Sequence, residues 1–235
     1  MSRSVDRPDS VVLLSGGMDS ATCLALAARR SGRVTALSVA YGQRHRREVA
    51  CARALARRFR VHSFQTVRLP IGPLLDSALT DTTRTLPGTG GRRARGAIPS
   101  TYVPARNTIF LALALALAES RGADRIYLGV NAVDYSGYPD CRPEYLAAFR
   151  RLARLATRRG VEGRPVRIEA PLLHLSKAEI VRLGERVGVP WELTWSCYAG
   201  GSVPCGRCDS CRLRAKGFDA AGVTDPLRPA RRGRS

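Results

Sequence analysis

A short apolar run, Val11 to Leu14, is followed at once by two glycines and then by a segment with helical periodicity. Such a run before glycines is typical of a buried strand, and 19–30 is the predicted helix. The loop between them reads Ser15-Gly16-Gly17-Met18-Asp19-Ser20. Glycines let the main chain approach an anion closely, and the start of a helix favours negative charge. We therefore expect Leu14 to Ser20 to bind a phosphate-bearing ligand.

Strands and helices alternate along the rest of the chain. This alternation predicts an α/β fold with a doubly wound, mostly parallel sheet, on which ligands bind beyond the carboxyl ends of the strands. The further predicted strands are 34–39, 61–67, 126–130 and 166–170. The further predicted helices are 46–58, 107–121, 143–159 and 176–187.

The domain organisation follows from composition. The predicted main domain spans residues 1–190, and its segment 70–99 is predicted to be a mobile loop, because Pro, Gly, Thr and Arg occur there without periodicity. A small cysteine-bearing segment occupies 191–222. The Pro- and Arg-rich tail, 223–235, is expected to be disordered.

The net charge of +20 suggests a nucleic-acid partner, because polyanions bind to Lys and Arg. However, two of the 39 basic residues are lysines and the rest are arginines. This bias fits arginines on solvated helix faces, as at Arg150, Arg151 and Arg154. We therefore expect nucleic acid not to be a direct substrate, although the positive electrostatic potential would favour the binding of a phosphate-rich ligand.

The chain carries no sign of a membrane segment. Its longest apolar stretch, 109–118, is shorter than the roughly 20 residues of a membrane span. The first ten residues lack the apolar region of a signal peptide. We expect a cytoplasmic protein.

Two cations stand at predicted helix starts. Arg106 precedes Asn107, which is a candidate helix cap, so Arg106 could brace phosphates or be an ordinary surface arginine. Lys177 follows Ser176 in a capping-box pattern. The helix dipole disfavours a cation there, so either an anionic partner or solvation must explain Lys177.

A loop rich in carboxylates and aromatic rings follows the predicted strand 126–130. Carboxylates accept hydrogen bonds from the N–H edge of a guanine-like ring, and tyrosines stack on it. An arginine there could pair with a substrate carboxylate, although an ordinary capped loop would also have this composition. The candidate substrate-binding residues are Asp134, Tyr135, Tyr138, Asp140 and Arg142.

Four of the seven cysteines cluster near the end of the chain, at Cys197, Cys205, Cys208 and Cys211. Without a secretion signal, such clustering favours a metal over disulfides. Four thiolates complete a tetrahedral Zn²⁺ site with no open position, so the site is expected to be structural. An iron–sulfur cluster takes the same ligands.

The glycine loop is similar to the SGG-x-DS signature of the ATP-pyrophosphatase (PP-loop) superfamily, whose members cleave ATP between the α- and β-phosphates. Two other segments resemble the 7-cyano-7-deazaguanine synthase family. These are 131–145, which looks like its substrate-recognition stretch, and 196–218, with its cysteines and Lys216-Gly217-Phe218, which looks like its zinc segment. The resemblance runs from about residue 11 to 220.

The resemblance implies conversion of 7-carboxy-7-deazaguanine and ammonia to the 7-cyano product through two adenylation steps. It implies ATP and Mg²⁺, one structural Zn²⁺ and a homodimer. On this basis Asp19, Ser15, Arg106 and Lys177 are the expected catalytic residues, with Asp19 orienting the loop or helping to hold Mg²⁺.

Two other interpretations remain open at this stage. A PP-loop enzyme that thiolates tRNA would explain the charge and would suit an iron–sulfur cluster, with Cys141 as its candidate free thiol. A non-catalytic zinc module that binds nucleic acid leaves the loop 15–20 unexplained.

Overall fold

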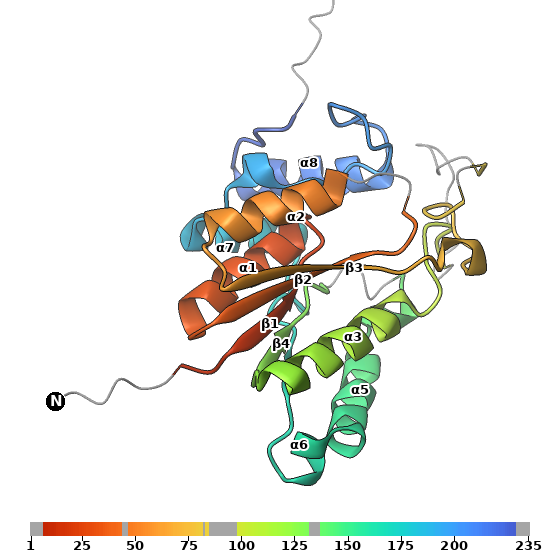
Figure 1. Ribbon diagram of the computed structural model, residues 1–235. Helices are drawn as coiled ribbons and strands as arrows, with labels where there is room; N and C mark the ends of the chain where they lie inside the picture. Colours follow the sequence, from red (N-terminus) through yellow and green to blue (C-terminus); the bar gives the residue numbers. More distant parts are fainter. Residues whose placement is uncertain (1–6, 44–46, 82, 85–97, 132–136, 229–235) are drawn as a thin grey trace, which may run out of the picture.

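The computed structural model describes residues 7–43, 47–81, 83–84, 98–131 and 137–228. Within them, five parallel strands form one sheet in the order β3-β2-β1-β4-β5 (Figure 1). The strands are β1 (Ser10–Leu13), β2 (Val34–Ala40), β3 (Ser63–Arg68), β4 (Arg125–Tyr127) and β5 (Arg167–Glu169). The predicted α/β class is therefore confirmed, as is its parallel sheet.

Helices cover both faces of this sheet (Figure 1). One face packs against α1 (Met18–Arg30), α2 (Arg47–Arg58), α7 (Lys177–Val187) and α8 (Asp209–Ala221). The other packs against α3 (Arg106–Arg121) and α5 (Pro143–Ala156), with α6 (Arg158–Val161) after α5. Short 3₁₀ helices lie at η1 (Gly72–Leu74), η2 (Pro139–Cys141) and η3 (Trp191–Leu193).

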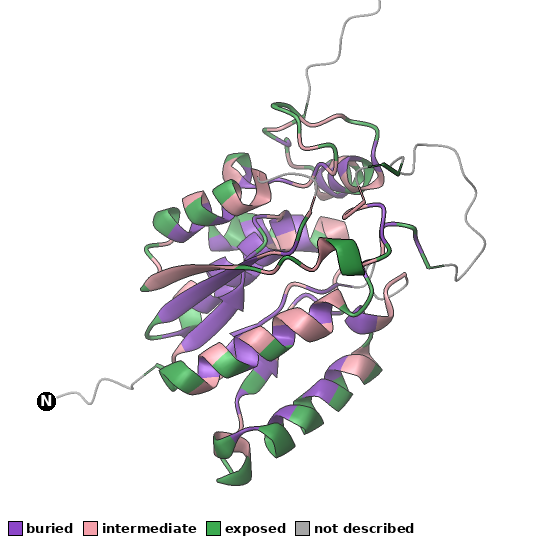
Figure 2. Cartoon of the chain, turned by 45° about the vertical axis from the view of Figure 1, so that its right-hand side comes forward, coloured by how far each residue is buried: buried purple, intermediate pink, exposed green. Residues whose placement is uncertain are grey.

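Strand β1 lies at the centre and is buried along its whole length (Figure 2). Its side chains alternate between the two cores, with Val12 in the core under α1 and Val11 and Leu13 in the core under α3. A strand buried on both faces needs an uninterrupted apolar sequence, which explains the run before the glycine loop.

Strand β1 pairs with β2 on one side and with β4 on the other. The chain leaves β1 toward β2 through α1, and it reaches β4 only later, through α3 on the opposite face. The order of the strands thus reverses between β1 and β4, and ligands of doubly wound sheets bind at this point.

Two helices differ from the sequence prediction. The helix expected over 143–159 ends at Ala156, because Thr157 adopts an extended backbone (φ −125°, ψ 148°) and its side chain caps α6 by accepting from the N–H of Gly160. Helix α8 lies in the cysteine segment, where the cysteine spacing had given no sign of a helix.

Part of the segment expected to be a mobile loop is packed. Ser77 and Ala78 are buried, and the N–H of Ala78 donates to the carbonyl of Ser100 at 2.9 Å. Residues 82 and 85–97 lie outside the described residues. The mobility of 70–99 stays a prediction.

The start of the expected disordered tail is also packed. Asp225 is buried and forms an ion pair with Arg214 of α8, with Nε and Oδ2 2.8 Å apart. A composition rich in Pro and Arg does not reveal this one buried carboxylate. The order of 223–228 therefore differs from the expectation, and 229–235 lie outside the described residues.

None of the helices in the described part of the chain is long and apolar enough to cross a membrane.

Candidate active site

The glycine loop turns directly from β1 into α1. Helix α1 begins at Met18, and no side chain of the described residues caps it at Gly17, so its first N–H groups could bind a ligand. The hydroxyl oxygens of Ser15 and Ser20 lie 3.1 Å apart, and that of Ser20 donates to the carbonyl of Gly17 at 3.0 Å. The two hydroxyls therefore lie together at the start of the helix.

Gly16 is the position in this loop that requires glycine. Its φ is +88°, and a Cβ there would lie 2.3 Å from the carbonyl oxygen of Glu48 in α2. The carbonyl of Gly16 accepts from the N–H of Trp195 at 2.8 Å. The loop is thus held by segments that lie far from it in sequence.

Asp19 is the centre of a polar group at the loop. Its Oδ2 accepts from Lys177 Nζ at 2.6 Å and from Asn131 Nδ2 at 3.2 Å. The anionic partner that Lys177 requires at the start of α7 is therefore Asp19. The other oxygen, Oδ1, is buried and has no hydrogen-bond partner among the described residues.

Arg106 begins α3 and points toward the end of β2. Its Nη1 donates to the hydroxyl of Tyr41 at 3.2 Å, and its guanidinium lies 5.8 Å from the centre of that ring. Asn107, the candidate cap, instead occupies the second helical position, and its N–H donates to Asp140 Oδ2 at 2.9 Å. A carboxylate from η2 thus replaces the expected cap.

One pocket of about 270 Å³ joins these groups. It lies at the carboxyl ends of β1, β2 and β4, as expected for this topology. The predicted site residues that line it are Leu14, Ser15, Gly17, Met18, Asp19, Ser20, Arg106, Tyr138 and Lys177. The residues predicted to bind phosphate, apart from Gly16, therefore line the same cavity as one predicted substrate residue.

Two of the other predicted substrate residues, Asp140 and Arg142, have different surroundings. Asp140 is buried and engaged with the start of α3, whereas Arg142 is exposed at the start of α5. Neither is among the described residues that line the pocket. Asp134 and Tyr135 lie outside the described residues.

Tyr138 is held at the pocket by contacts from the segment before α3. Its hydroxyl lies 3.0 Å from Thr101 Oγ1, and its ring centre lies 6.0 Å from that of Tyr102. The ring of Tyr138 is thus held in one orientation at the pocket.

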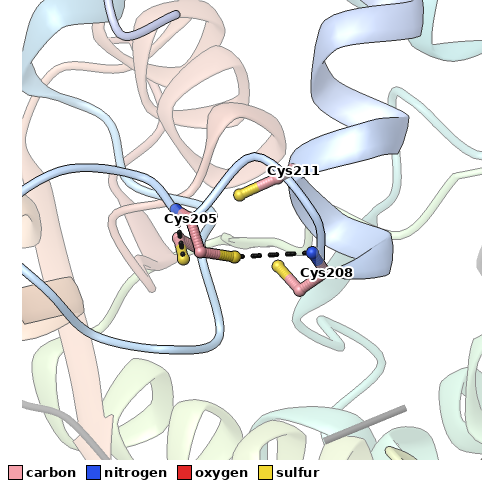
Figure 3. A group of neighbouring side chains, drawn as sticks. Cys205, Cys208 and Cys211 are labelled. Carbon is pink, nitrogen blue, oxygen red and sulfur yellow. Dashed lines mark hydrogen bonds between the residues drawn. The ribbon is translucent and has the colours of Figure 1, made fainter. Parts of the chain in front are cut away.

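The four clustered cysteines converge as their spacing predicts. The sulfur atoms of Cys197, Cys205, Cys208 and Cys211 all lie within 4.8 Å of one another. Figure 3 shows Cys205 and Cys208, where the N–H of Cys208 donates to Cys205 Sγ at 3.4 Å. Four sulfurs about 2.3 Å from one Zn²⁺ lie roughly 3.8 Å apart, so small shifts would complete a tetrahedral site.

The cysteine segment also contacts the glycine loop. Trp195 donates from its ring nitrogen to the carbonyl of Cys197 at 2.9 Å and from its main chain to Gly16. The guanidinium of Arg47 lies 4.1 Å from the centre of the Trp195 ring. A metal held by the cysteines would therefore stabilise one wall of the pocket.

The family model described as "Queuosine biosynthesis protein QueC" matches residues 9–222, which include the glycine loop, the pocket and all four clustered cysteines. This chain belongs to the QueC family. The family resemblance predicted from the motifs is thereby confirmed.

Relatives in the QueC family match along almost their whole length. The 7-cyano-7-deazaguanine synthase of Anaeromyxobacter sp. (strain Fw109-5) is 57% identical over 220 residues, which cover 92% of this chain and 94% of that one. The 7-cyano-7-deazaguanine synthase of Coxiella burnetii (strain Dugway 5J108-111) is 52% identical over 219 residues, covering 92% and 96%.

A solved structure shares the fold. NMN synthetase from Francisella tularensis superposes with a TM-score of 0.50 at 16% identity, covering 94% of this chain and 79% of that one. At this identity the likeness concerns the fold alone.

Some pocket residues of this QueC family member were missed by sequence reasoning. Tyr41 directly follows β2, so the rule on carboxyl ends of strands could have found it. Glu48, in the first turn of α2, and Arg214, on α8, also line the pocket but carry no local sequence signal.

Glu48 has unusual acid–base properties. Desolvation raises its pKa to about 7, although the positive charge of Arg106 acts in the opposite direction. A carboxylate with this pKa changes its charge near neutral pH, so it is suited to proton transfer.

Proposed function

We propose that this protein uses ATP to convert 7-carboxy-7-deazaguanine and ammonia into 7-cyano-7-deazaguanine. The observation that carries the proposal is the single pocket in which the glycine loop, Arg106, Lys177 and Tyr138 meet. Membership of the QueC family and the relatives named 7-cyano-7-deazaguanine synthase support the choice of substrate.

The first step activates the substrate carboxylate. The free N–H groups at the start of α1 and the hydroxyls of Ser15 and Ser20 bind the terminal phosphates of ATP. The carboxylate attacks the α-phosphorus, and pyrophosphate leaves. Lys177 and Arg106 offset the charge that develops on the leaving group.

Asp19 has a positioning role in this step. It holds Lys177 at the loop through the 2.6 Å contact, with side chains that are only 13% (Lys177) and 21% (Asp19) exposed. A charge in a partly desolvated pocket acts more strongly on the reaction than one in water. Asp19 therefore holds the side-chain ammonium group of Lys177 at the place where pyrophosphate leaves.

The second step makes the carbon–nitrogen bond. Ammonia attacks the acyl carbon and displaces AMP, which gives an amide. A second ATP activates the amide oxygen in the same pocket, and loss of AMP with two protons leaves the nitrile. The ring of Tyr138 stacks on the flat purine-like ring, and Asp134, Tyr135, Asp140 and Arg142 stay candidates for its recognition.

Two metals belong to the proposal. The buried Oδ1 of Asp19, which has no hydrogen-bond partner in the described part of the chain, fits a hard cation such as Mg²⁺, which would neutralise phosphate charge. The four converging cysteines fit a structural Zn²⁺. We also propose a cytoplasmic location and a homodimer, which size-exclusion chromatography with light scattering would test.

The test is an assay of the purified protein with 7-carboxy-7-deazaguanine, ATP, Mg²⁺ and ammonium, followed by mass spectrometry. We expect the nitrile, AMP and pyrophosphate. Amide alone would mean an enzyme that stops after the first adenylation. If 7-carboxy-7-deazaguanine is not consumed and ATP is cleaved only when tRNA is added, then the protein has a tRNA-modifying function instead.

A matched pair of variants ties the activity to this pocket. Asp19→Asn removes the charge that holds Lys177, and turnover is expected to fall at least 100-fold, on the order of the loss of a transition-state charge contact. Asp124→Asn removes a similar charge from an ion pair with Arg159, whose atoms lie 2.6 Å apart and in which Asp124 is 45% exposed. This control is expected to keep its activity.

A further inference from the structure

Glu48 lies directly over the glycine loop. A Cβ on Gly16 would lie 2.3 Å from the carbonyl oxygen of Glu48, so the two main chains are in contact. Glu48 also lines the pocket that holds Ser15, Arg106 and Lys177. Glu48 is therefore a residue of the pocket in which the adenylated substrate would form.

Asp19 and Glu48 are the two carboxylates among the described residues that line the pocket. Asp19 accepts hydrogen bonds from Lys177 and Asn131. Glu48 has a different environment, because burial raises its pKa and the charge of Arg106 offsets this only in part. Two carboxylates in unlike environments take unlike roles.

The titratable groups that interact with Glu48, among the described residues, come from three elements. They are Arg106 at the start of α3, Tyr41 after β2 and Cys51 on α2. Burial raises the pKa values of Tyr41 and Cys51, so both stay neutral near pH 7. Glu48 is therefore the member of this group that changes its charge near neutral pH.

We propose that Glu48 is the general base that accepts a proton from the nitrogen nucleophile during amide formation. This inference rests on the proposed function. Glu48 acts in the nitrogen step, in which the C–N bond forms, whereas the glycine loop, Arg106 and Lys177 act in the adenylation step.

Amide formation from ammonium releases two protons, so the step needs a base. Ammonium gives one proton to the Glu48 carboxylate and becomes ammonia. The lone pair of ammonia forms the C–N bond, and the C–O bond to AMP breaks with its electron pair remaining on AMP. The nitrogen then loses its second proton to the AMP phosphate, which leaves the neutral amide.

The experiment compares Glu48→Gln with wild type in two half-reactions. Exchange of pyrophosphate into ATP that depends on 7-carboxy-7-deazaguanine measures the adenylation step. The rate of amide formation with ammonium measures the nitrogen step. Hydroxylamine serves as a second nucleophile, because it is largely unprotonated at neutral pH and does not need the first proton transfer. Glu144→Gln is the matched control, since Glu144 occupies the first turn of α5 and is exposed.

We expect Glu48→Gln to lower amide formation from ammonium about 100-fold or more, the usual size of general-base catalysis. Without the base the variant must use free ammonia, so its rate should rise with pH only as the fraction of free ammonia rises, and should lack the separate ionisation near pH 7 that wild type shows. Pyrophosphate exchange and hydroxamate formation should stay within about threefold of wild type, which also shows that the variant is folded. Glu144→Gln should behave as wild type in every assay.

The outcomes separate the two proposals. Wild type that neither exchanges pyrophosphate nor consumes the acid would overturn the proposed function itself. Wild type that forms the nitrile, with Glu48→Gln forming amide at an undiminished rate, would overturn only the role of Glu48. A variant that loses pyrophosphate exchange together with amide formation would place Glu48 in adenylation or folding, which also contradicts the inference.

Discussion

Gly217 of α8 packs directly against Lys177 at the start of α7. A Cβ on Gly217 would lie 2.9 Å from the Cβ of Lys177 and 3.3 Å from its carbonyl carbon. Cys208 directly precedes α8, and Cys211 lies in its first turn. The cysteine segment is therefore in contact with the lysine that pairs with Asp19 across the pocket.

Replacing Gly217 with alanine is expected to displace Lys177. A shift of this kind lowers the rate of adenylation by between about 10- and 100-fold, because a misplacement of about 1 Å at a reacting centre has a large effect. Pyrophosphate exchange at saturating ATP measures it. Gly201→Ala is the control, since its Cβ would make only an ordinary contact, 3.4 Å from the carbonyl of Val203. Equal rates in the two variants would show that α8 does not position Lys177.

The buried ion pair between Arg214 and Asp225 is expected to stabilise the fold. Both side chains are less than a tenth exposed, at 4% and 6%, and Arg214 also donates to Thr194 at 2.7 Å. Asp225→Ala leaves the guanidinium buried without its counter-charge, at a cost of about 3–5 kcal/mol. Urea denaturation measures this change.

Asp219→Ala is the matched control, because its partner Arg228 and Asp219 itself are both about half exposed. Exposed pairs contribute roughly 0–1 kcal/mol. If Asp225→Ala is as stable as this control, then the packing of residues 223–228 contributes nothing to the stability of the fold.

The cysteine cluster is expected to hold about one Zn²⁺ per chain. Cys205→Ser removes one ligand, so we expect metal loss and destabilisation of at least ~3 kcal/mol, since structural zinc contributes directly to folding. Elemental analysis and thermal unfolding measure the two effects. Cys23→Ala, in the core under α1, should retain its metal. Iron and sulfide in place of zinc would contradict the assignment.

Glu48 predicts a dependence of stability on pH. Its pKa of about 7 in the folded protein lies above the usual 4.5, so the folded state binds the proton more tightly than the unfolded state. The free energy of unfolding contributed by this group therefore falls as pH rises from about 4.5 to 7. The Glu48→Gln variant has no carboxyl group at this position, so its free energy of unfolding does not fall in this way.

We therefore expect Glu48→Gln to become more stable than wild type as pH rises from 5 to 8. The change is about 1 to 3 kcal/mol, because one pKa unit corresponds to about 1.4 kcal/mol. Urea denaturation at each pH measures it, with Glu144→Gln as the control. A stability difference that does not vary with pH would show that the pKa of Glu48 is not raised.

Some features of this protein were determined by short stretches of sequence. The apolar run before Ser15, the glycines and the periodicity of α1 predict a strand, an anion-binding turn and a helix, because each depends on residues a few positions apart. The spacing of Cys205, Cys208 and Cys211 predicts a shared metal site for the same reason. The alternation of such units also predicted the parallel sheet.

Other features were decided only by the tertiary structure. Asp19 and Lys177 are 158 positions apart, and nothing near either residue indicates that their side chains meet. Glu48 looks like an ordinary first-turn glutamate until α2 packs on Gly16, and Asp225 looks like a tail residue until it is buried against Arg214. The reason is physical, because desolvation and charge pairing depend on which distant segments the packed core brings together.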